Sequence, residues 1–332
     1  MTGASLNEVE GSAWDDLLDR LGVSDLYYRR GFVEASAALV ASRPVLLHLS
    51  GAGGDVVFPC LVRADPVDVV TSYGYGGPLP LGADPPVAEF ADAYVAWCAR
   101  RGVVSSFVVH HPLFATQRVP MRGFRVQPLA GTVAWPLDEP DLLGVMHKHH
   151  RRQVRRAEGA GLVATVRAPP EDLSEFVALY DDAMVRLGAA DFHRFNDDYW
   201  QALAAAVTLV QVVVRGGDGE AVAAVLGAGE PPWLHYHLGA AAQAGRGTGA
   251  SHLALYTLAR WGRDHGYAQL HLGGGVGGRD DDLLVYKQRF APGEPLASCI
   301  GKAVHDLPAY TALAGPPSAD YEGFFPAYRR SY

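Results

Sequence analysis

The strongest constraint on the fold is a pair of similar segments, one in each half of the chain. In each, a helix with apolar periodicity contains a tryptophan and ends five residues later at a glycine. The tryptophans are Trp97 and Trp261 and the glycines are Gly102 and Gly266, so both separations are 164 residues (261 − 97 and 266 − 102). Each glycine suits a left-handed helix C-cap and precedes a β-rich run.

An earlier turn repeats at nearly the same offset. Residues 54–57 (GDVV) in the first half match residues 219–222 (GEAV) in the second. Because order, spacing and turn residues recur together, they predict two copies of one α/β unit, in which Trp97 superimposes on Trp261. The alternative is two unrelated α/β segments of similar length.

The second copy has the element order of the core of the GCN5-related N-acetyltransferases (GNATs). Strand-like runs at residues 210–215, 221–226 and 234–238 are separated by turns, and a Gly-rich loop, a helix and another strand follow. We therefore predict an α/β fold with mixed sheets, built from two tandem GNAT-like acyltransferase domains.

A basic segment between the two copies marks the predicted domain boundary. It begins after Pro136, and residues 147–156 are its most basic part. We predict an N-terminal domain of residues 1–145 and a C-terminal domain of residues 146–332. A linker helix covers about residues 146–158, and the C-terminal tail is free to pack back on the first domain.

Charge and cysteine content narrow the class of protein. The formal net charge of −8 argues against a protein that coats long nucleic acids, and we expect no DNA partner. Three widely spaced cysteines without metal-ligand spacing are typical of a reduced intracellular protein. Acidic residues stand where a signal peptide would be basic, and no apolar run is long enough to span a membrane. The expected location is the cytoplasm, without membrane insertion.

A Gly-rich loop precedes the tryptophan helix of the second copy. Residues 246–251 (RGTGAS) resemble the loop whose backbone N–H groups hold the pyrophosphate of coenzyme A in acetyltransferases. The spacing from this loop to Trp261 also fits. The loop is either a working phosphate site or a remnant of the fold, because Gly-rich loops before helices also serve packing.

Several passages together resemble the Fem family of aminoacyl-tRNA-dependent peptidyltransferases. The most specific is Leu272-Gly-Gly-Gly followed by residues 283–290 (LLVYKQRF), which is similar to the family's Leu-Gly-Gly and Phe/Tyr-Lys-x-x-Phe motifs. Residues 73–78, 147–161 and 234–239 agree as well. The similarity covers roughly residues 25–310.

The resemblance implies transfer of an amino acid from its tRNA ester to the amine of a peptide-like acceptor, with no further cofactor. Lys287 matches the family lysine that stabilises the oxyanion, and Tyr286 beside it either contacts the acceptor end of the tRNA or fills the core. A surface role for Lys287 is the plainer alternative. The substrate contacts implied by the resemblance are Tyr73, Tyr75, His235, Tyr236, His237, Arg279 and Phe290.

Two histidine pairs are further candidates. Val109-His110-His111-Pro112 stands where the family often has an arginine, so the role of that arginine is in doubt here. His111 is a candidate acceptor for the proton of the attacking amine, unless it is a structural residue at a strand end. On the strand at residues 234–238, His235 and His237 share one face. A metal site there lacks a third ligand at suitable spacing, so we expect no metal.

The basic segment predicts a local RNA contact. In a helix, Lys148, Arg152, Arg155 and Arg156 fall on one side, and Arg151 lies beside them. This stripe either binds tRNA phosphates or is a solvated face paired with acidic residues elsewhere.

Three functions remain open at this stage. The leading one is an aminoacyl-tRNA-dependent transferase whose acceptor is a small peptide or other amine, either a peptide antibiotic under construction or a peptidoglycan precursor. The sequence has no long coiled-coil arm such as some family members carry, and this favours the peptide antibiotic as the acceptor. The second is an N-acyltransferase that uses acetyl-CoA or another acyl-CoA. The third is a binding module without catalysis.

Overall fold

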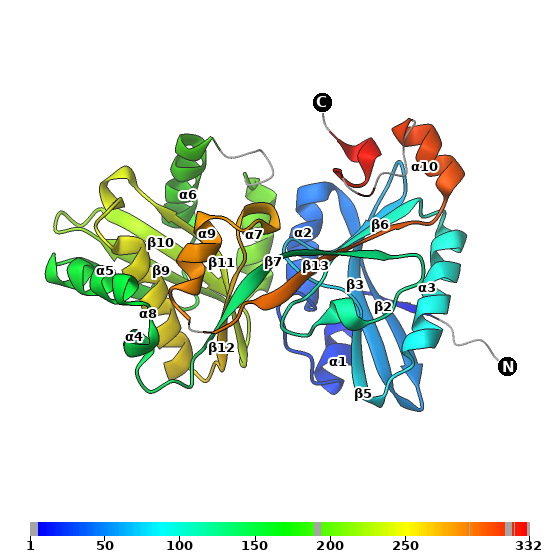
Figure 1. The fold of residues 1–332 in the computed structure, drawn as a ribbon, viewed down its shortest axis with the longest axis horizontal. Helices are drawn as coiled ribbons and strands as arrows, with labels where there is room; N and C mark the ends of the chain where they lie inside the picture. Colours follow the sequence, from blue (N-terminus) through cyan, green and yellow to red (C-terminus); the bar gives the residue numbers. More distant parts are fainter. Residues whose placement is uncertain (1–5, 189–193, 292, 316–320, 322, 331–332) are drawn as a thin grey trace. The chain divides into compact units, whose positions relative to one another are not determined.

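The computed structural model describes residues 6–188, 194–291, 293–315, 321 and 323–330, and the chain divides into two compact units (Figure 1). Unit 1 comprises residues 1–23, 27–129 and 297–332. Unit 2 comprises residues 24–26 and 130–296. No helix in the described ranges has the length and apolarity needed to cross a membrane.

Unit 1 is a mixed sheet with helices. Its strands are β1 (Asn7–Val9), β2 (Ser42–Gly51), β3 (Gly53–Arg63), β4 (Asp68–Val70), β5 (Leu79–Asp84), β6 (Ser105–Val109) and β13 (Leu296–Val304). Its main helices are α1 (Ser12–Arg20), α2 (Arg30–Val40), α3 (Val87–Arg101) and α10 (Leu307–Ala314). The strand order is β1-β2-β3-β4-β6-β13, and β5 pairs with β3.

Unit 2 has the same kind of architecture. Its strands are β7 (Arg125–Pro136), β8 (Val163–Arg167), β9 (Leu209–Arg215), β10 (Ala221–Ala228), β11 (Trp233–Ala241) and β12 (Gln269–Gly273). Its helices are α4 (Leu142–Val145), α5 (Lys148–Gly159), α6 (Ser174–Leu187), α7 (Asp197–Ala206), α8 (Ala250–Asp264) and α9 (Asp282–Gln288). The strand order is β7-β12-β11-β10-β9-β8.

The repeated segments of the sequence form the same structure in both units. Trp97 lies on α3 and Trp261 on α8, and the glycines that follow, Gly102 and Gly266, both have left-handed φ angles of 66° and 82°. Each helix then leads into a strand that pairs in parallel with an earlier strand of its own unit, β6 with β4 and β12 with β11. Each copy therefore contains one parallel pair within an otherwise antiparallel sheet.

The last strand of each sheet comes from the segment that follows the other unit in the chain. β7 follows the elements of unit 1 but pairs antiparallel with β12, with Leu270 opposite Trp135. β13 follows the elements of unit 2 but pairs antiparallel with β6, with Ile300 opposite Val109. The compact units therefore change at residues 129/130 and 296/297, whereas the predicted domains were residues 1–145 and 146–332.

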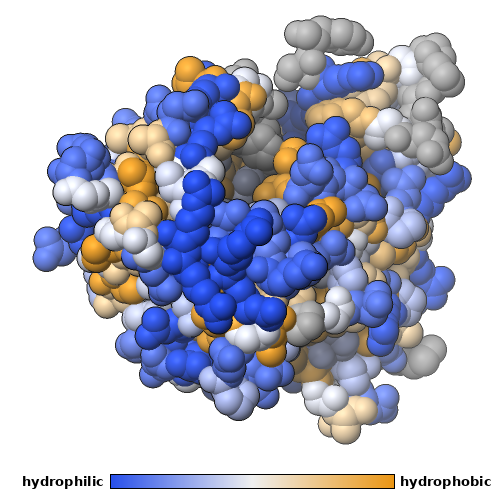
Figure 2. Space-filling model, turned by 60° about the vertical axis from the view of Figure 1, so that its left-hand side comes forward, coloured by the Kyte–Doolittle hydropathy of each residue, from blue (hydrophilic) through white to orange (hydrophobic). Residues whose placement is uncertain are grey.

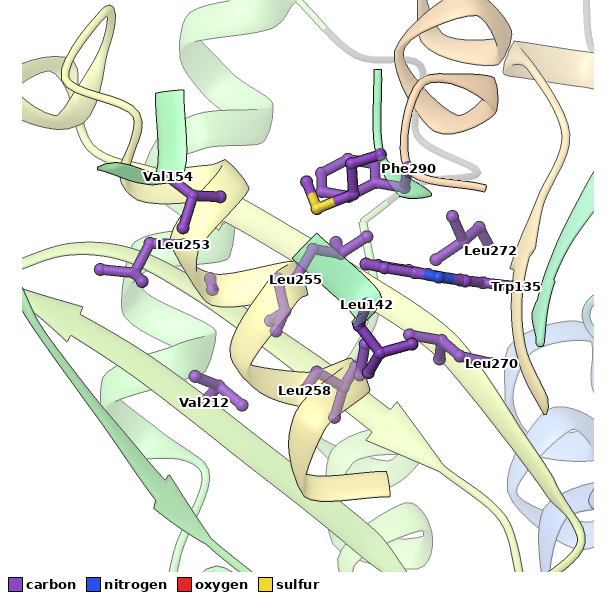
Figure 3. Close-up of a cluster of buried hydrophobic side chains, with 14 of the residues drawn as sticks. Trp135, Leu142, Val154, Val212, Leu253, Leu255, Leu258, Leu270, Leu272 and Phe290 are labelled. Carbon is purple, nitrogen blue, oxygen red and sulfur yellow. The ribbon is translucent and has the colours of Figure 1, made fainter. Parts of the chain in front are cut away.

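The core of unit 2 lies between α8 and the sheet (Figure 3). Leu255 and Leu258 of α8 pack with Leu270 and Leu272 of β12 and with Trp135 of β7, and all five are at most 1% exposed. The aliphatic positions on α8 recur at helical spacing, which places them on one face. This packing fixes β12, and with it the loop that leads to α9.

Unit 1 has its own core. Phe90, Tyr94 and Trp97 of α3 pack against β2 and β3, whose contributions include Val45 and Phe58. Tyr94 is fully buried, and its hydroxyl pairs with Ser106 at 2.8 Å. This hydrogen bond holds α3 against β6, which ends at Val109, just before His110.

Candidate active site

Lys287 lies near the end of α9 and is 8% exposed. Its Nζ donates a hydrogen bond to the Gly274 carbonyl at 2.7 Å and lies 5.6 Å from the centroid of the Tyr236 ring. Both contacts hold the ammonium of a buried lysine, unlike the solvated surface lysine that the sequence left open.

Burial changes the acidity of this lysine. Loss of solvent lowers the pKa of Lys287 to about 8, and the nearby Asp281 carboxylate opposes this only in part. No carboxylate of the described chain lies within 4.0 Å of its ammonium. A buried ammonium without an ion-pair partner is suited to stabilise a negative charge that develops next to it.

The loop between β12 and α9 positions Lys287. Asp281 caps α9 by accepting from the Leu284 N–H at 3.0 Å, and its other oxygen accepts from the Val276 N–H at 2.8 Å. A Cβ on Gly275 would lie 2.2 Å from the Arg279 carbonyl, so only glycine fits there. Arg279 is exposed and its Nε donates to the Val276 carbonyl, so its backbone and side chain both hold the loop.

Tyr286 lies on α9 directly before Lys287, and Phe290 follows the helix, which ends at Gln288. Phe290 is fully buried, with its ring centroid 5.5 Å from that of Trp135, so it belongs to the core. Tyr286 lies at 5.1 Å from the rings of Phe290, His150 and His252. Burial raises the pKa of Tyr286 well above its ordinary value. Its hydroxyl is buried and has no hydrogen-bond partner among the described residues.

The three candidate residues on β11, His235, Tyr236 and His237, do not all point to the same face of the sheet. Tyr236 points to the face that carries α8 and α9 and packs against the core there. On the other face, His237 meets the Tyr199 hydroxyl of α7 at 2.6 Å. The register of β10 and β11 shifts at this point, so His237 lies at a β-bulge. Burial lowers the pKa of His237 to about 3.

Two residues that sequence reasoning missed surround His235. Its Nε2 lies 2.9 Å from the Asp25 carboxylate, and its Nδ1 lies 3.4 Å from Nδ1 of His271. All three side chains are at most 2% exposed. His271 stands beside His235 in the parallel register of β11 and β12. Asp25 comes from the short segment 24–26, which is 210 residues away in sequence.

The candidates of unit 1 form an aromatic cluster. The His111 ring is fully buried, stacks on Phe114 at 4.6 Å and contacts the edges of Tyr27 and Tyr75. Its backbone N–H donates to the Gly76 carbonyl at 2.8 Å. These contacts describe a histidine held at a strand end.

Two further unit 1 residues have shifted pKa values: the buried His110, next to His111 in the sequence, and the half-buried Tyr73. Burial raises the pKa of Tyr73 to about 12, and it lowers the pKa of the adjacent His110 to about 4. His110 Nδ1 lies 3.2 Å from the Thr116 hydroxyl. His110 and Tyr73 are therefore both neutral near pH 7.

The segment that carries the predicted basic stripe forms helix α5. Lys148, Arg152, Arg155 and Arg156 of α5 are exposed, and none forms an ion pair with a carboxylate in the described part of the chain. Arg151 differs, because its guanidinium donates to the carbonyls of Gly144 and Met146 and so ties α5 to α4. Figure 2, which brings the α5 side of Figure 1 forward, shows a broad continuous area of hydrophilic residues.

A basic pocket lies at the first turn of α5. It has a volume of about 450 Å³ and is lined by His147, Lys148, His149, Arg152 and Arg289. The N-terminal N–H groups of a helix add partial positive charge at such a position. The pocket is suited to a phosphate or carboxylate group.

Hydrogen bonds connect this pocket with the helix that carries Lys287. The His147 N–H donates to the Arg289 carbonyl at 2.9 Å, and His150 Nε2 donates to the Tyr286 carbonyl at the same distance. Tyr286 directly precedes Lys287 in the sequence, and Arg289 lies two residues after it. The basic surface and the candidate oxyanion partner are therefore held together within unit 2.

The Gly-rich loop leads into the N-terminus of α8. Gly249 has a φ of 90°, and a Cβ there would lie 2.3 Å from the Gln153 carbonyl and 3.3 Å from Ala157 Cβ, both on α5. Packing between α5 and α8 thus accounts for this glycine. Gly247, by contrast, has a φ of 73° and open space around its Cα.

Sheet order, the helix–glycine–strand repeat and the central β-bulge define a chain with the GNAT acyltransferase fold in two tandem copies. The family model of an acetyltransferase (GNAT) domain matches residues 145–288, which is most of unit 2. No curated protein matches the sequence.

Solved structures extend this likeness to the whole chain. FemX superimposes with a TM-score of 0.67 and 14% identity, covering 92% of this chain and 99% of FemX. L-PGS from Bacillus licheniformis gives a TM-score of 0.59 at 16% identity, covering 92% and 96%. A tandem GNAT protein from the clavulanic acid biosynthesis pathway gives 0.51 at 11%, covering 91% and 99%. The predicted tandem GNAT fold and its resemblance to the Fem type are confirmed.

Proposed function

We propose that this protein is an aminoacyl-tRNA-dependent aminoacyltransferase, which forms a peptide bond between the aminoacyl group of a charged tRNA and the amine of a small acceptor. The observation that carries the proposal is the direct connection between α5 and α9. Four exposed cations on α5 have no ion-pair partner among the described residues, and two hydrogen bonds, one from the His147 N–H and one from the His150 ring, join the start of α5 to the carbonyls of Arg289 and Tyr286. A phosphate-binding surface held next to an oxyanion partner is the arrangement that a polyanionic donor such as tRNA needs.

The chemistry requires little from the protein. The neutral amine attacks the ester carbonyl, a C–N bond forms, and the carbonyl oxygen becomes an oxyanion. The C–O bond to the terminal ribose then breaks, and the proton lost by the amine ends on that ribose oxygen. Lys287 would stabilise the oxyanion with an N–H that does not contact Gly274. No covalent enzyme intermediate is needed, because the ester is already activated.

The acceptor is an amine on a peptide or peptide-like compound, in antibiotic biosynthesis or on a peptidoglycan precursor. We favour an acceptor in antibiotic biosynthesis because the sequence lacks a coiled-coil arm. The structural likeness to a tandem GNAT protein from the clavulanic acid biosynthesis pathway supports the same choice. The full burial of His111 among aromatic rings, including that of Tyr75, argues for a positioning role rather than one in proton transfer.

An acyl-CoA-dependent N-acyltransferase is the second candidate. The match of residues 145–288 to an acetyltransferase domain favours it, as does the loop before α8. The packing of Gly249 against Gln153 weakens it, because that contact explains the glycine without a bound pyrophosphate.

The deciding experiment compares the two donors with one preparation of the full chain. Radiolabelled aminoacyl groups on a mixture of charged tRNAs, and separately acetyl-CoA, would be offered with short peptides as acceptors. We expect label to reach the acceptor from charged tRNA and to be lost when the tRNA is first treated with ribonuclease. Transfer from acetyl-CoA without any RNA would refute the tRNA assignment and leave the acyltransferase fold. Transfer from neither donor would favour a binding module.

A further inference from the structure

Three histidines of unit 2 lie together where α5, α8 and α9 meet. His149 and His150 are in the first turn of α5 and His252 is in the first turn of α8. Each offers one ring nitrogen, and the three nitrogens lie within 4.8 Å of one another. The ring centroids of His150 and His252 are 4.4 Å apart, and the two rings are nearly perpendicular.

Two of these nitrogens are buried without a hydrogen bond. His150 Nε2 lies 2.9 Å from the Tyr286 carbonyl, which can only accept, so Nε2 carries the proton and Nδ1 presents its lone pair. That Nδ1, on a side chain 1% exposed, has no partner among the described residues, and neither has Nε2 of His252. Buried polar atoms are normally paired, so two orphans in one cluster indicate a missing ligand.

We propose that His149, His150 and His252 bind a zinc ion. Neutral imidazoles are good ligands for Zn²⁺, and three protein ligands with one remaining position form a common zinc geometry. The His150–Tyr286 hydrogen bond is the outer contact that typically fixes the tautomer of a ligating histidine. The separation of up to 4.8 Å would shorten on binding through small rotations of the rings.

The surroundings of the cluster indicate what completes the site. His149 also lines the basic pocket, so we expect the fourth position of the ion to open toward it. Lys148, Arg152 and Arg289 line the same pocket, and their charges oppose a lone divalent cation. The fourth ligand is therefore expected to be an anion, such as a phosphate or carboxylate oxygen, which offsets that repulsion. The two orphan nitrogens alone would also suit a bridging water, but the third histidine favours the metal.

The test uses the metal-free full chain, purified without a polyhistidine tag. Calorimetric titration with Zn²⁺, with and without inorganic phosphate, gives the stoichiometry and affinity. Titration with Co²⁺ as a spectroscopic substitute reports tetrahedral coordination through its visible absorption. We expect one ion per chain, tighter binding in phosphate, and at least tenfold weaker binding in His149→Ala and in His252→Ala. His265→Ala, which removes an exposed histidine at the far end of α8, should bind as the wild type does.

His149 is only half-buried, so its replacement should leave the fold intact, and thermal unfolding of the metal-free variants checks this. If His252→Ala fails to fold, His149→Ala alone decides. Absence of Zn²⁺ binding to the wild type would overturn the proposal. So would equal affinity in the His149→Ala and His265→Ala variants, because the ion would then lie elsewhere.

Discussion

The two units use the same helix, glycine and parallel strand, yet the ends of these strands differ. In unit 1, β6 runs into His110 and His111, which are buried among aromatic rings and Thr116. In unit 2, β12 runs into the glycines that begin at Gly273, and the chain turns through them to α9 and Lys287. The strand of one copy thus leads into a filled aromatic cluster and that of the other into a loop before a buried lysine, so the two copies differ in the segment that follows the shared strand.

The buried lysines make the comparison sharper. Unit 1 has Lys302 on β13, 3% exposed, which donates to the carbonyls of Tyr321 and Gly323. Lys287 donates to one carbonyl, that of Gly274, among the residues that the structure describes. Lys302 thus holds the chain after α10, whereas the ammonium of Lys287 keeps N–H groups that bond no described residue, as its proposed role requires.

The largest expected effect comes from exchanging these two lysines for alanine. Lys287→Ala should lower the turnover of aminoacyl transfer by about 100-fold or more with a similar melting temperature, since loss of one oxyanion partner costs about 2.7–4 kcal/mol. Lys302→Ala should instead lower the melting temperature. Single-turnover rates and thermal unfolding of both variants measure this. Wild-type turnover in Lys287→Ala would contradict the proposed difference between a catalytic lysine in unit 2 and a structural lysine in unit 1.

A second test separates packing from ligand binding in the Gly-rich loop. Gly249→Ala should lower the free energy of unfolding by about 3 kcal/mol, because a left-handed residue gains a Cβ that meets the Gln153 carbonyl. Gly247→Ala, which meets no neighbour, should cost about 1 kcal/mol. Urea denaturation measures both. Equal small losses would contradict the close contact between α5 and α8.

The pH dependence of the rate tests the state of Lys287. Its pKa is lowered to about 8, so the charged form is present below that pH and is lost above it. Turnover should therefore fall above about pH 8, by up to about tenfold per pH unit. Lys287→Arg keeps its charge throughout, so this decline should be absent in the activity that remains. An unchanged decline in that variant would assign it to another group.

The same shift affects stability with a defined sign. The unfolded lysine keeps its proton up to about pH 10.4, whereas the folded one loses it near 8, so the unfolded state binds more protons between these values. The contribution of Lys287 to the unfolding free energy should therefore rise with pH in that window. Denaturation of wild type and Lys287→Met at pH 8 and pH 10 gives the difference.

The smallest expected effect concerns the basic surface. Changing Arg152 and Arg155 to Gln should weaken binding of charged tRNA and flatten the logarithmic salt dependence by about 0.7–0.9 per lost phosphate contact. Arg100→Gln on α3 of unit 1, also exposed near a helix end, is the matched control and should change neither. If all three substitutions weaken binding equally, the contact is not local to α5.

The sequence predicted local elements well, because their signals are local. Turns and periodicity located β9, β10 and β11 to within a few residues, and the glycine spacing revealed the repeat. The pairing of β7 and β13 was not predictable in this way, because nothing in a strand's own sequence says which distant strand it will meet. The domain ranges drawn from the basic segment therefore differ from the compact units.

The candidate site also contains residues that local sequence signals could predict and residues that they could not. Lys287 was found through a motif, and its burial agrees with the role proposed for it. Asp25 was missed because its partner His235 is 210 residues away, and His271 because only the parallel register places it beside His235. Arg151 was grouped with the basic stripe by helical spacing, but spacing gives no sign that the α4 carbonyls bind it. The histidine cluster combines residues that are adjacent in sequence with one about 100 positions later.

The exchange of β7 and β13 has a consequence for how the chain is made on the ribosome. Unit 2 is nearly continuous, from residue 130 to residue 296, so its sheet is complete once that stretch has emerged. Unit 1 begins first but waits for β13, whose partner β6 was synthesised about 190 residues earlier. Until then β6 has a free edge, which is open to wrong pairing. The N-terminal unit should therefore be the last to finish folding, in the reverse of the order of synthesis.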